Sequence, residues 1–323
     1  MAEVSSTAPV GTRVRRAKAE VRRKVPLSVI LTQNWEMYLM LVPSIIFLML
    51  FRFLPIWGIS IAFIDFNPFK GILGSEWVGL GNFERFFTSR RAFQLLYNTV
   101  FIAIGKIVIG QIAAILFALL INEVRSRPFR RVTQTLTTLP HFMSWVIVGG
   151  IMVGVLSTTG IVNQAITSLG LPPIKFLGRA NIFPWTLIGL DTWKGFGWGA
   201  IIYLAALTNI DPALYEAAAV DGANRWQRIR HITIPGISST IVLMSCLSLG
   251  NVLNAGFEQI LVLMNPMVER TGDIIDTYVY RVGLMSSEWS LGAAVGLFKS
   301  VIGFGLILLS YWLADKLANY RIF

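Results

Sequence analysis

Residues 216–235, EAAAVDGANRWQRIRHITIP, form a polar stretch between two long apolar stretches of this 323-residue chain. The stretch contains an E-A-A triplet at residues 216–218, a glycine at Gly222 and the motif I-x-I-P at residues 232–235. Three residues separate the triplet from the glycine, and nine separate the glycine from the motif. This spacing decides how the rest of the chain is interpreted.

Local signals predict a short helix over about Pro212 to Val220 at the start of this stretch. Asp211 is a good N-cap, and proline is favoured at the first helical position. At i, i+3 and i+4 one face of the helix then presents Leu214, Ala217 and Ala218. Small alanines on that face would let a partner surface approach closely, and Gly222 can end the helix in a left-handed conformation.

The composition on either side is that of a membrane protein. Hydrophobic residues make up 54% of the chain and charged residues 14%, whereas average proteins carry about 25% charged residues. A helix needs about 20 apolar residues to cross the hydrocarbon core. We therefore predict an all-α membrane protein with six spans, roughly Leu39–Ile64, Leu95–Ile121, Val132–Leu156, Phe183–Thr208, Ile237–Met264 and Leu291–Leu313.

The basic residues are unevenly distributed between the two sides of the predicted spans. Sixteen lysines and arginines lie in the N-terminal segment, the second and fourth connections and the C-terminal tail, and eight lie in the other three connections. Because cytoplasmic loops are enriched in lysine and arginine, both termini and the 216–235 stretch are predicted to lie inside the cell. The net charge of +11 is then explained by topology and by the lipid bilayer, so nucleic acid is not an expected partner.

The spacing of residues 216–235 resembles the cytoplasmic loop of ABC permeases, the membrane subunits of binding-protein-dependent, ATP-driven importers. Further resemblance to sugar-importer permeases lies in Gly79-Leu80-x-Asn82-Phe83, Leu139-Pro140 and Asn209-x-Asp211-Pro212. Residues 256–260, 265–266 and 276–281 resemble the branch that handles oligosaccharides and polysaccharides, including permeases of alginate importers. The resemblance covers about Tyr38 to Leu317; Ile234, where leucine is usual, is a conservative departure.

This resemblance implies a six-helix type I importer domain with a cytoplasmic coupling helix, in the bacterial inner membrane. It implies four partner subunits: a second homologous permease, two ATPases and an extracytoplasmic solute-binding protein. ATP and magnesium would bind the ATPases, and this chain would hold no cofactor. Transport of a saccharide by alternating access is the implied function. The implied domains are a basic segment at 1–35, a permease domain at 36–317 with its coupling loop at 211–235, and a tail at 318–323.

Within the coupling loop, the resemblance implies ATPase contact through Glu216, Ala217, Ala218, Asp221, Gly222 and Pro235. Glu216 could pair with a basic residue of the ATPase, or it could cap its own helix. Both interpretations remain open from the sequence.

Several ionisable residues are predicted at membrane depth: Arg52, Lys106, Asp191, Lys194, Glu258 and Lys299. Each costs at least ~2.5 kcal/mol at the bilayer midplane unless a partner or water compensates it. Asp191 and Lys194, three residues apart, could pair on one helix face. Polar interruptions at Pro140 and from Asn251 to Glu258 would suit helices that line a water-filled path.

A path for an acidic saccharide gives a second interpretation of these residues. Its candidate lining is Lys194, Trp193, Trp198, Asn251 and Glu258, with the tryptophans as stacking surfaces for sugar rings. Packing and anchoring at the membrane interface are the alternative roles for such aromatics.

Catalysis and metal binding are not indicated. The chain has one cysteine, Cys246, and two histidines, His141 and His231, which lie far apart in the sequence. An ion- or proton-coupled sugar carrier is an alternative function, but no inverted repeat is visible. An intramembrane enzyme acting on lipid-linked sugars is a third, but convergent acidic or histidine groups are missing from the spans.

Overall fold

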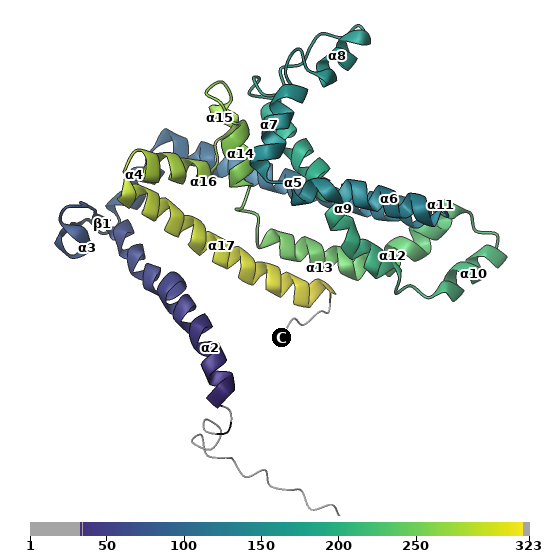
Figure 1. The fold of residues 1–323 in the computed structure, drawn as a ribbon, viewed down its shortest axis with the longest axis horizontal. Helices are drawn as coiled ribbons and strands as arrows, with labels where there is room; N and C mark the ends of the chain where they lie inside the picture. Colours follow the sequence, from purple (N-terminus) through teal and green to yellow (C-terminus); the bar gives the residue numbers. More distant parts are fainter. Residues whose placement is uncertain (1–32, 34, 319–323) are drawn as a thin grey trace, which may run out of the picture. The chain divides into compact units, whose positions relative to one another are not determined.

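The computed structural model describes residue 33 and residues 35–318, and it is mostly helical (Figure 1). The chain divides into two compact units, Met1–Trp57 and Gly58–Phe323. The predicted N-terminal segment at 1–35 and tail at 318–323 lie almost entirely outside the described residues.

Helices of eleven residues or more are α2 (Trp35–Leu48), α5 (Arg90–Asn122), α6 (Arg127–Thr138), α7 (Trp145–Val155), α9 (Phe183–Leu207), α13 (Ser238–Leu249) and α17 (Trp289–Ala318). Shorter ones are α3 (Gly71–Gly74), α4 (Gly81–Phe87), α8 (Ile161–Ser168), α10 (Pro212–Val220), α11 (Arg225–Arg228), α12 (Ile234–Gly236), α14 (Phe257–Leu263), α15 (Glu269–Gly272) and α16 (Ile275–Tyr278). Tighter or wider helical segments are η1 (Met49–Phe53), η2 (Leu54–Phe63), η3 (Leu139–Phe142), η4 (Ile229–Thr233) and η5 (Val279–Met285). The strands β1 (Ile64–Asp65) and β2 (Glu76–Trp77) pair antiparallel.

Three helices are long and apolar enough to cross a membrane: Trp35–Phe63, Arg90–Asn122 and Trp289–Lys316. They correspond to the first, second and sixth predicted spans. Two bent helix pairs raise the number to five in the described part of the chain. The fourth predicted span corresponds to α9, a continuous helix of 25 residues that carries the charged residues Asp191 and Lys194.

The third predicted span, Val132–Leu156, is not one straight helix. The helical segments Arg127–Phe142 and Trp145–Val155 meet at an angle of 105°. Pro140 lies in η3, and the backbone of Met143 is extended. Ser144 then caps α7 by accepting a hydrogen bond from the Ile147 amide. The bend therefore has a local cause, since proline weakens the helix and a new N-cap restarts it.

The fifth predicted span, Ile237–Met264, is also interrupted. Helix α13 ends at Leu249, and α14 begins only at Phe257. Gly256 has φ +92°, a left-handed conformation that favours glycine. The polar residues between 250 and 256 thus form a break in the middle of the span.

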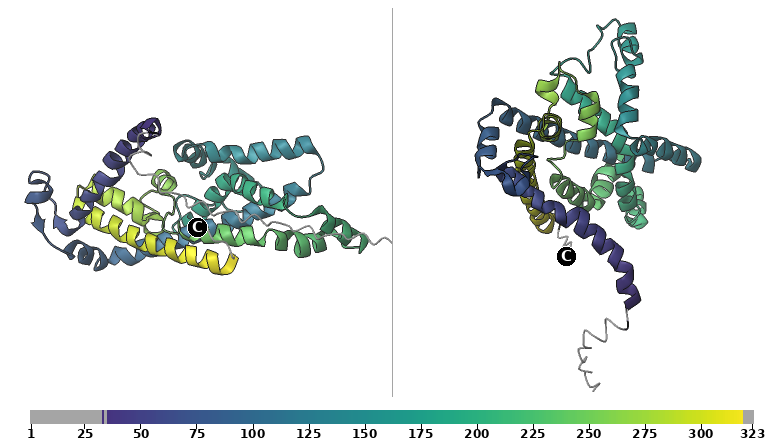
Figure 2. Two further views of the ribbon diagram at one scale, coloured as in Figure 1. Left: turned by 90° about the horizontal axis from the view of Figure 1, so that it is seen from below. Right: turned by 60° about the vertical axis from the view of Figure 1, so that its left-hand side comes forward.

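The core of the second unit is formed where α5 packs along α9, and α17 packs along α13 (Figures 1 and 2). Gly105 of α5 allows the close approach, because a Cβ there would lie 2.4 Å from the Ile188 side chain. One hydrophobic cluster, around Ile102 and Leu187, includes residues of the break such as Val252. A second cluster, which includes Ala200 and Ile237, lies along the same helices nearer the 211–235 loop.

The segment before α5 explains part of the sugar-permease motif near residue 80. Trp77 belongs to β2, and the short helix α4 begins at Gly81. Asn82 is buried and donates hydrogen bonds to the carbonyls of Ala62 and Ile64, both at 3.1 Å. Its amide thereby fixes α4 against the end of η2.

We expect Gly256→Ala to destabilise the protein by about 1–3 kcal/mol, since a side chain is strained at a positive φ. Its Cβ would also lie 2.6 Å from the Lys106 ammonium. Thermal unfolding of the purified protein in detergent measures the effect. The matched control is Gly296→Ala in α17, where no atom lies within 4 Å of the new Cβ. Equal melting temperatures for the two variants would contradict the assignment of strain to Gly256.

Candidate functional site

The coupling loop folds as the sequence predicts. Helix α10 spans Pro212–Val220, and the Asp211 side chain caps it by accepting from the Ala213 amide at 2.9 Å. At the other end Gly222 has φ +75°. The amide of Ala223 donates to the Ala218 carbonyl at 2.9 Å, which completes a helix-ending Schellman motif.

A second helical segment, residues 225–236, follows and is joined to α10. Asn224 and Gln227 form a capping box at the start of α11. The Tyr215 hydroxyl on α10 hydrogen-bonds the Thr233 hydroxyl on η4 at 3.0 Å. Because both ends of α10 are capped and its middle is tied to η4, the loop is a defined structural element.

No side chain of α10 is buried within the chain. Glu216, Ala217, Asp221 and Gly222 are exposed, Ala218 is half-buried, and Pro235 is exposed on α12. Val220 is 88% exposed and Leu214 53%. A hollow of about 370 Å³ lies between the end of α10 and the following segment, with Asp221 and His231 among its lining residues. Figure 1 shows α10 at the edge of the second unit, beyond the packed helices.

Two adjoining hollows of about 210 and 380 Å³ form what we term the central polar cavity. Both are lined by Lys106, Ile107, Asp191, Met244 and Ser248. The smaller extends toward Gln111 and Thr192, and the larger toward Asn251 and Asn254 at the break in the fifth span. The polar break thus lines a hollow, as the sequence predicts.

Lys106 is the buried charge at the centre of this cavity. Its ammonium donates to the Ala255 carbonyl at 2.7 Å and to the Gln259 side chain. It also pairs with Asp191, 3.5 Å away. Gln259 in turn donates to the Leu187 carbonyl at 2.8 Å. This network joins α5, α9 and α14 across the break.

The predicted pairing of Asp191 with Lys194 is wrong, because the Asp191 carboxylate pairs with Lys106. Lys194 instead donates to the His141 carbonyl at 2.9 Å and lies over the Trp145 ring, 5.3 Å from its centroid. These contacts fasten α9 to the bend between α6 and α7.

The five candidate pathway residues are only partly brought together. Asn251 lines the central polar cavity. Trp198 stacks on His141 with ring centroids 4.8 Å apart, and Trp193 and Glu258 are exposed outside the cavity. Lys194 packs beside the bend. A role in saccharide passage stays a prediction for all five.

The remaining intramembrane charges differ in their surroundings. Lys299 on α17 pairs with Asp276 at 2.5 Å and donates to Asn254 at 3.0 Å. Arg52 lies exposed on η1 in the first unit. The cavity residues that sequence reasoning missed include the neutral residues Gln111, Thr192 and Ser248. The Thr192 hydroxyl is buried and has no hydrogen-bond partner among the described residues.

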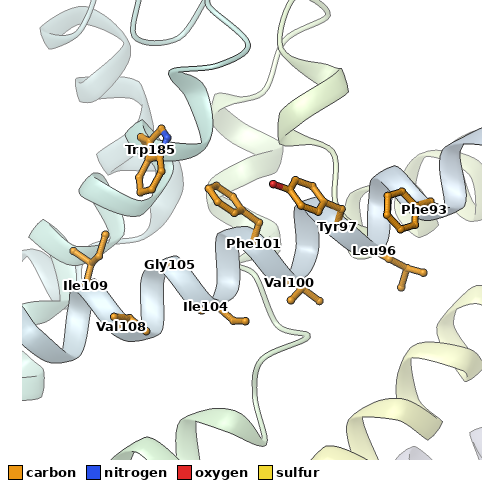
Figure 3. A pocket seen from close by; sticks show the side chains of 10 residues that line it. All are labelled: Phe93, Leu96, Tyr97, Val100, Phe101, Ile104, Gly105, Val108, Ile109 and Trp185. Atoms are coloured by element: carbon orange, nitrogen blue, oxygen red, sulfur yellow. The ribbon is translucent and has the colours of Figure 1, made fainter.

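A larger hollow, of about 610 Å³, lies along one face of α5 (Figure 3). Figure 3 shows Phe93, Tyr97, Phe101 and Ile109 on α5, with Trp185 of α9 facing them. Its lining is almost wholly apolar. Such a surface suits hydrocarbon and offers little to a hydroxyl-rich saccharide.

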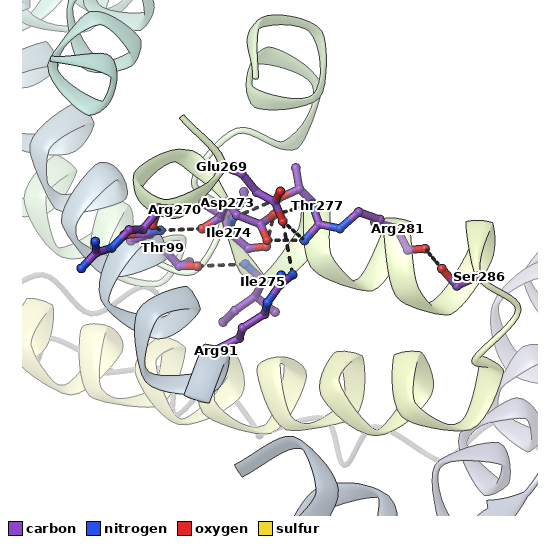
Figure 4. A network of polar contacts seen from close by, with 11 residues as sticks. Arg91, Thr99, Glu269, Arg270, Asp273, Ile274, Ile275, Thr277, Arg281 and Ser286 are labelled. Carbon is purple, nitrogen blue, oxygen red and sulfur yellow. Dashed lines mark hydrogen bonds and ion pairs between the residues drawn. The ribbon is translucent and has the colours of Figure 1, made fainter. Parts of the chain in front are cut away.

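An ion-pair network holds the long connection before α17 against the start of α5 (Figure 4). Glu269 pairs with Arg91 at 3.2 Å and with Arg281 at 3.3 Å, and Arg281 also pairs with Asp273. The Thr277 hydroxyl donates to Asp273 at 2.7 Å. Burial alone would lower the pKa of Arg281. The hydrogen bond to Asp273 and the negative charge of Asp273 have the larger effect together, so the pKa of Arg281 lies above its usual value.

Residues 106–319 match the family of binding-protein-dependent transport system inner membrane components. The match includes α10 and, apart from Ala103, every residue that lines the central polar cavity. The chain belongs to this family. It is therefore a permease, an inner-membrane transport component, rather than an enzyme.

Several relatives of the permease carry sugar-transport names. It is 43% identical over 307 residues to the polygalacturonan/rhamnogalacturonan transport system permease protein YteP of Bacillus subtilis, covering 95% of each chain. It is 42% identical to Protein LplB of the same organism, covering 89% of this chain and 91% of that one. Among solved structures, a chain of a bacterial ABC transporter involved in import of the acidic polysaccharide alginate matches with 37% identity and a TM-score of 0.82. That match covers 90% of this chain and 99% of the other.

We expect Lys106→Met to lower the free energy of unfolding by about 3 kcal/mol, because it leaves Asp191 and the Ala255 carbonyl without their partner. The double variant Lys106→Met/Asp191→Asn should be more stable than the single variant, since the unpaired carboxylate is removed as well. The free energies of unfolding of the single and the double variant, measured in detergent, test whether Lys106 and Asp191 compensate each other. A double variant less stable than the single one would show that Lys106 does not compensate Asp191.

Proposed function

We propose that this permease carries an oligosaccharide or polysaccharide into the cell as one of two permease subunits of an ATP-driven importer. A homologous second permease, two ATPases and an extracytoplasmic binding protein complete the assembly. ATP and magnesium act on the ATPases. Both termini and α10 lie in the cytoplasm, in keeping with the distribution of lysine and arginine.

The observation that carries this proposal is α10 itself. The helix is capped at both ends and tied to η4, yet it buries none of its side chains in this chain. Exposed apolar residues on a fixed helix are suited to a protein partner. In the family to which the chain belongs, the corresponding partner is the ATPase, so Glu216, Ala217, Ala218, Asp221 and Gly222 form the proposed contact, with Pro235 ending the loop.

The proposed cargo is an acidic saccharide. Polygalacturonan is a polymer of a uronic acid, and it appears in the name of a relative that covers 95% of the chain. Alginate is called an acidic polysaccharide in the description of a structural relative. Neutral hydrogen-bonding groups around the central polar cavity, among them Asn251, Asn254 and Ser248, suit the hydroxyl groups of such a cargo. These resemblances favour an importer over an ion-coupled carrier.

Glu216→Lys should reduce saccharide-stimulated ATP hydrolysis by the reconstituted assembly about tenfold or more. A charge-assisted hydrogen bond contributes about 1.5–3 kcal/mol, and each 1.4 kcal/mol changes an equilibrium tenfold. Glu123→Lys is the matched control, because Glu123 is also an exposed acidic residue on a connection predicted to be cytoplasmic. Full stimulation with Glu216→Lys, or an equal loss with Glu123→Lys, would count against the contact.

A further inference from the structure

The charges around the central polar cavity compensate one another. Lys106 is paired with Asp191, and Lys299 with Asp276. The cavity therefore offers hydrogen bonds to a saccharide but no uncompensated positive charge to its carboxylates. Recognition of acidic groups needs a different place in the fold.

A separate pocket of about 490 Å³ lies between the start of α5 and the connection that holds α15. Its volume falls within the ~300–1,000 Å³ typical of small-ligand sites. The basic residues in its lining are Arg90, Arg91 and Arg270, and the acidic ones are Glu269 and Asp273.

The two carboxylates of this pocket are already engaged. Glu269 pairs with Arg91 and Arg281, and Asp273 pairs with Arg281. No carboxylate of the described residues lies within 4.0 Å of the guanidinium of Arg90 or Arg270. In Figure 4 the Arg270 side chain extends away from the ion-pair network. Two guanidinium groups thus remain for an external anion.

The frame of the pocket is rigid. Asn98 is 3% exposed and donates to the Arg270 carbonyl at 3.0 Å and to the Asp273 carbonyl at 2.9 Å. Gln94 donates to the Asn98 side chain at 2.9 Å. The Arg270 backbone is thereby fixed against α5, where Arg90 begins the helix. Guanidinium groups on fixed backbones favour bidentate binding of carboxylates.

We infer that this pocket binds a uronate carboxylate of the incoming saccharide through Arg90 and Arg270. Both arginines lie in connections that the proposed topology puts outside the cell, so the pocket would meet the saccharide before the central polar cavity does. The inference rests on the proposed function and adds to it the place where acidic cargo is distinguished from neutral cargo.

Calorimetry on the purified whole transporter, without its binding protein, tests the site. It measures the binding of trigalacturonate and of its carboxyl-reduced counterpart. The intact transporter should prefer trigalacturonate. Arg90→Gln/Arg270→Gln should weaken trigalacturonate binding about tenfold and leave the reduced sugar unaffected. Lys175→Gln/Arg179→Gln, which removes two exposed charges from another outer connection, should bind as the intact transporter does.

Unchanged trigalacturonate binding by Arg90→Gln/Arg270→Gln would overturn the inference, as would an equal loss in the Lys175→Gln/Arg179→Gln control. Loss of binding-protein docking with saccharide binding intact would likewise overturn it and assign the pocket to a protein surface. Uptake of trigalacturonate by the complete assembly in liposomes is measured in parallel. Arginine-dependent binding without any uptake would leave the site standing and overturn the proposed cargo.

Discussion

The ammonium of Lys106 is the group on which the arrangement of the second unit depends. A break in a membrane helix leaves backbone carbonyls without helical partners, and each unsatisfied group is costly in hydrocarbon. Lys106 satisfies the Ala255 carbonyl at this break and also contacts Gln259 and Asp191. Gly256 leaves room for it. One side chain therefore allows the fifth span to be interrupted and the central polar cavity to exist beside the interruption.

The permease carries three surfaces of different chemistry. The central polar cavity carries compensated charges and neutral hydrogen-bonding groups. Helix α10 presents exposed apolar and acidic residues on a fixed scaffold. The arginine pocket at the start of α5 carries positive charge that its own carboxylates do not balance. In the proposed function, a saccharide, an ATPase and a carboxylate would each use one of these surfaces.

Elements that depend on neighbouring residues could be predicted from the sequence, and elements that depend on distant contacts could not. Asp211, Pro212 and Gly222 define both ends of α10 locally, and the predicted bounds agree with the structure. Pro140 and the run from Asn251 were recognised as interruptions, but their effect on the spans was not. The contact between Lys106 and Ala255 joins residues 149 positions apart. From the sequence alone, Lys194, three residues away on the same helix, is the partner that Asp191 could have.

The hydrogen bond between Tyr215 and Thr233 has a mechanical consequence for the chain that follows. From Arg225 to Leu249 the backbone is helical apart from a 56° bend near Ile237, and Asn251 lies immediately beyond its end. Thr233, which bonds to α10, lies just before the bend, and the far end of the segment borders the central polar cavity. Between Ser238 and Leu249 the helix is unbroken, so each inserted or deleted residue would turn Asn251 by about 100° about the helix axis. In the proposed function, the length of this helix would matter to coupling as much as any side chain.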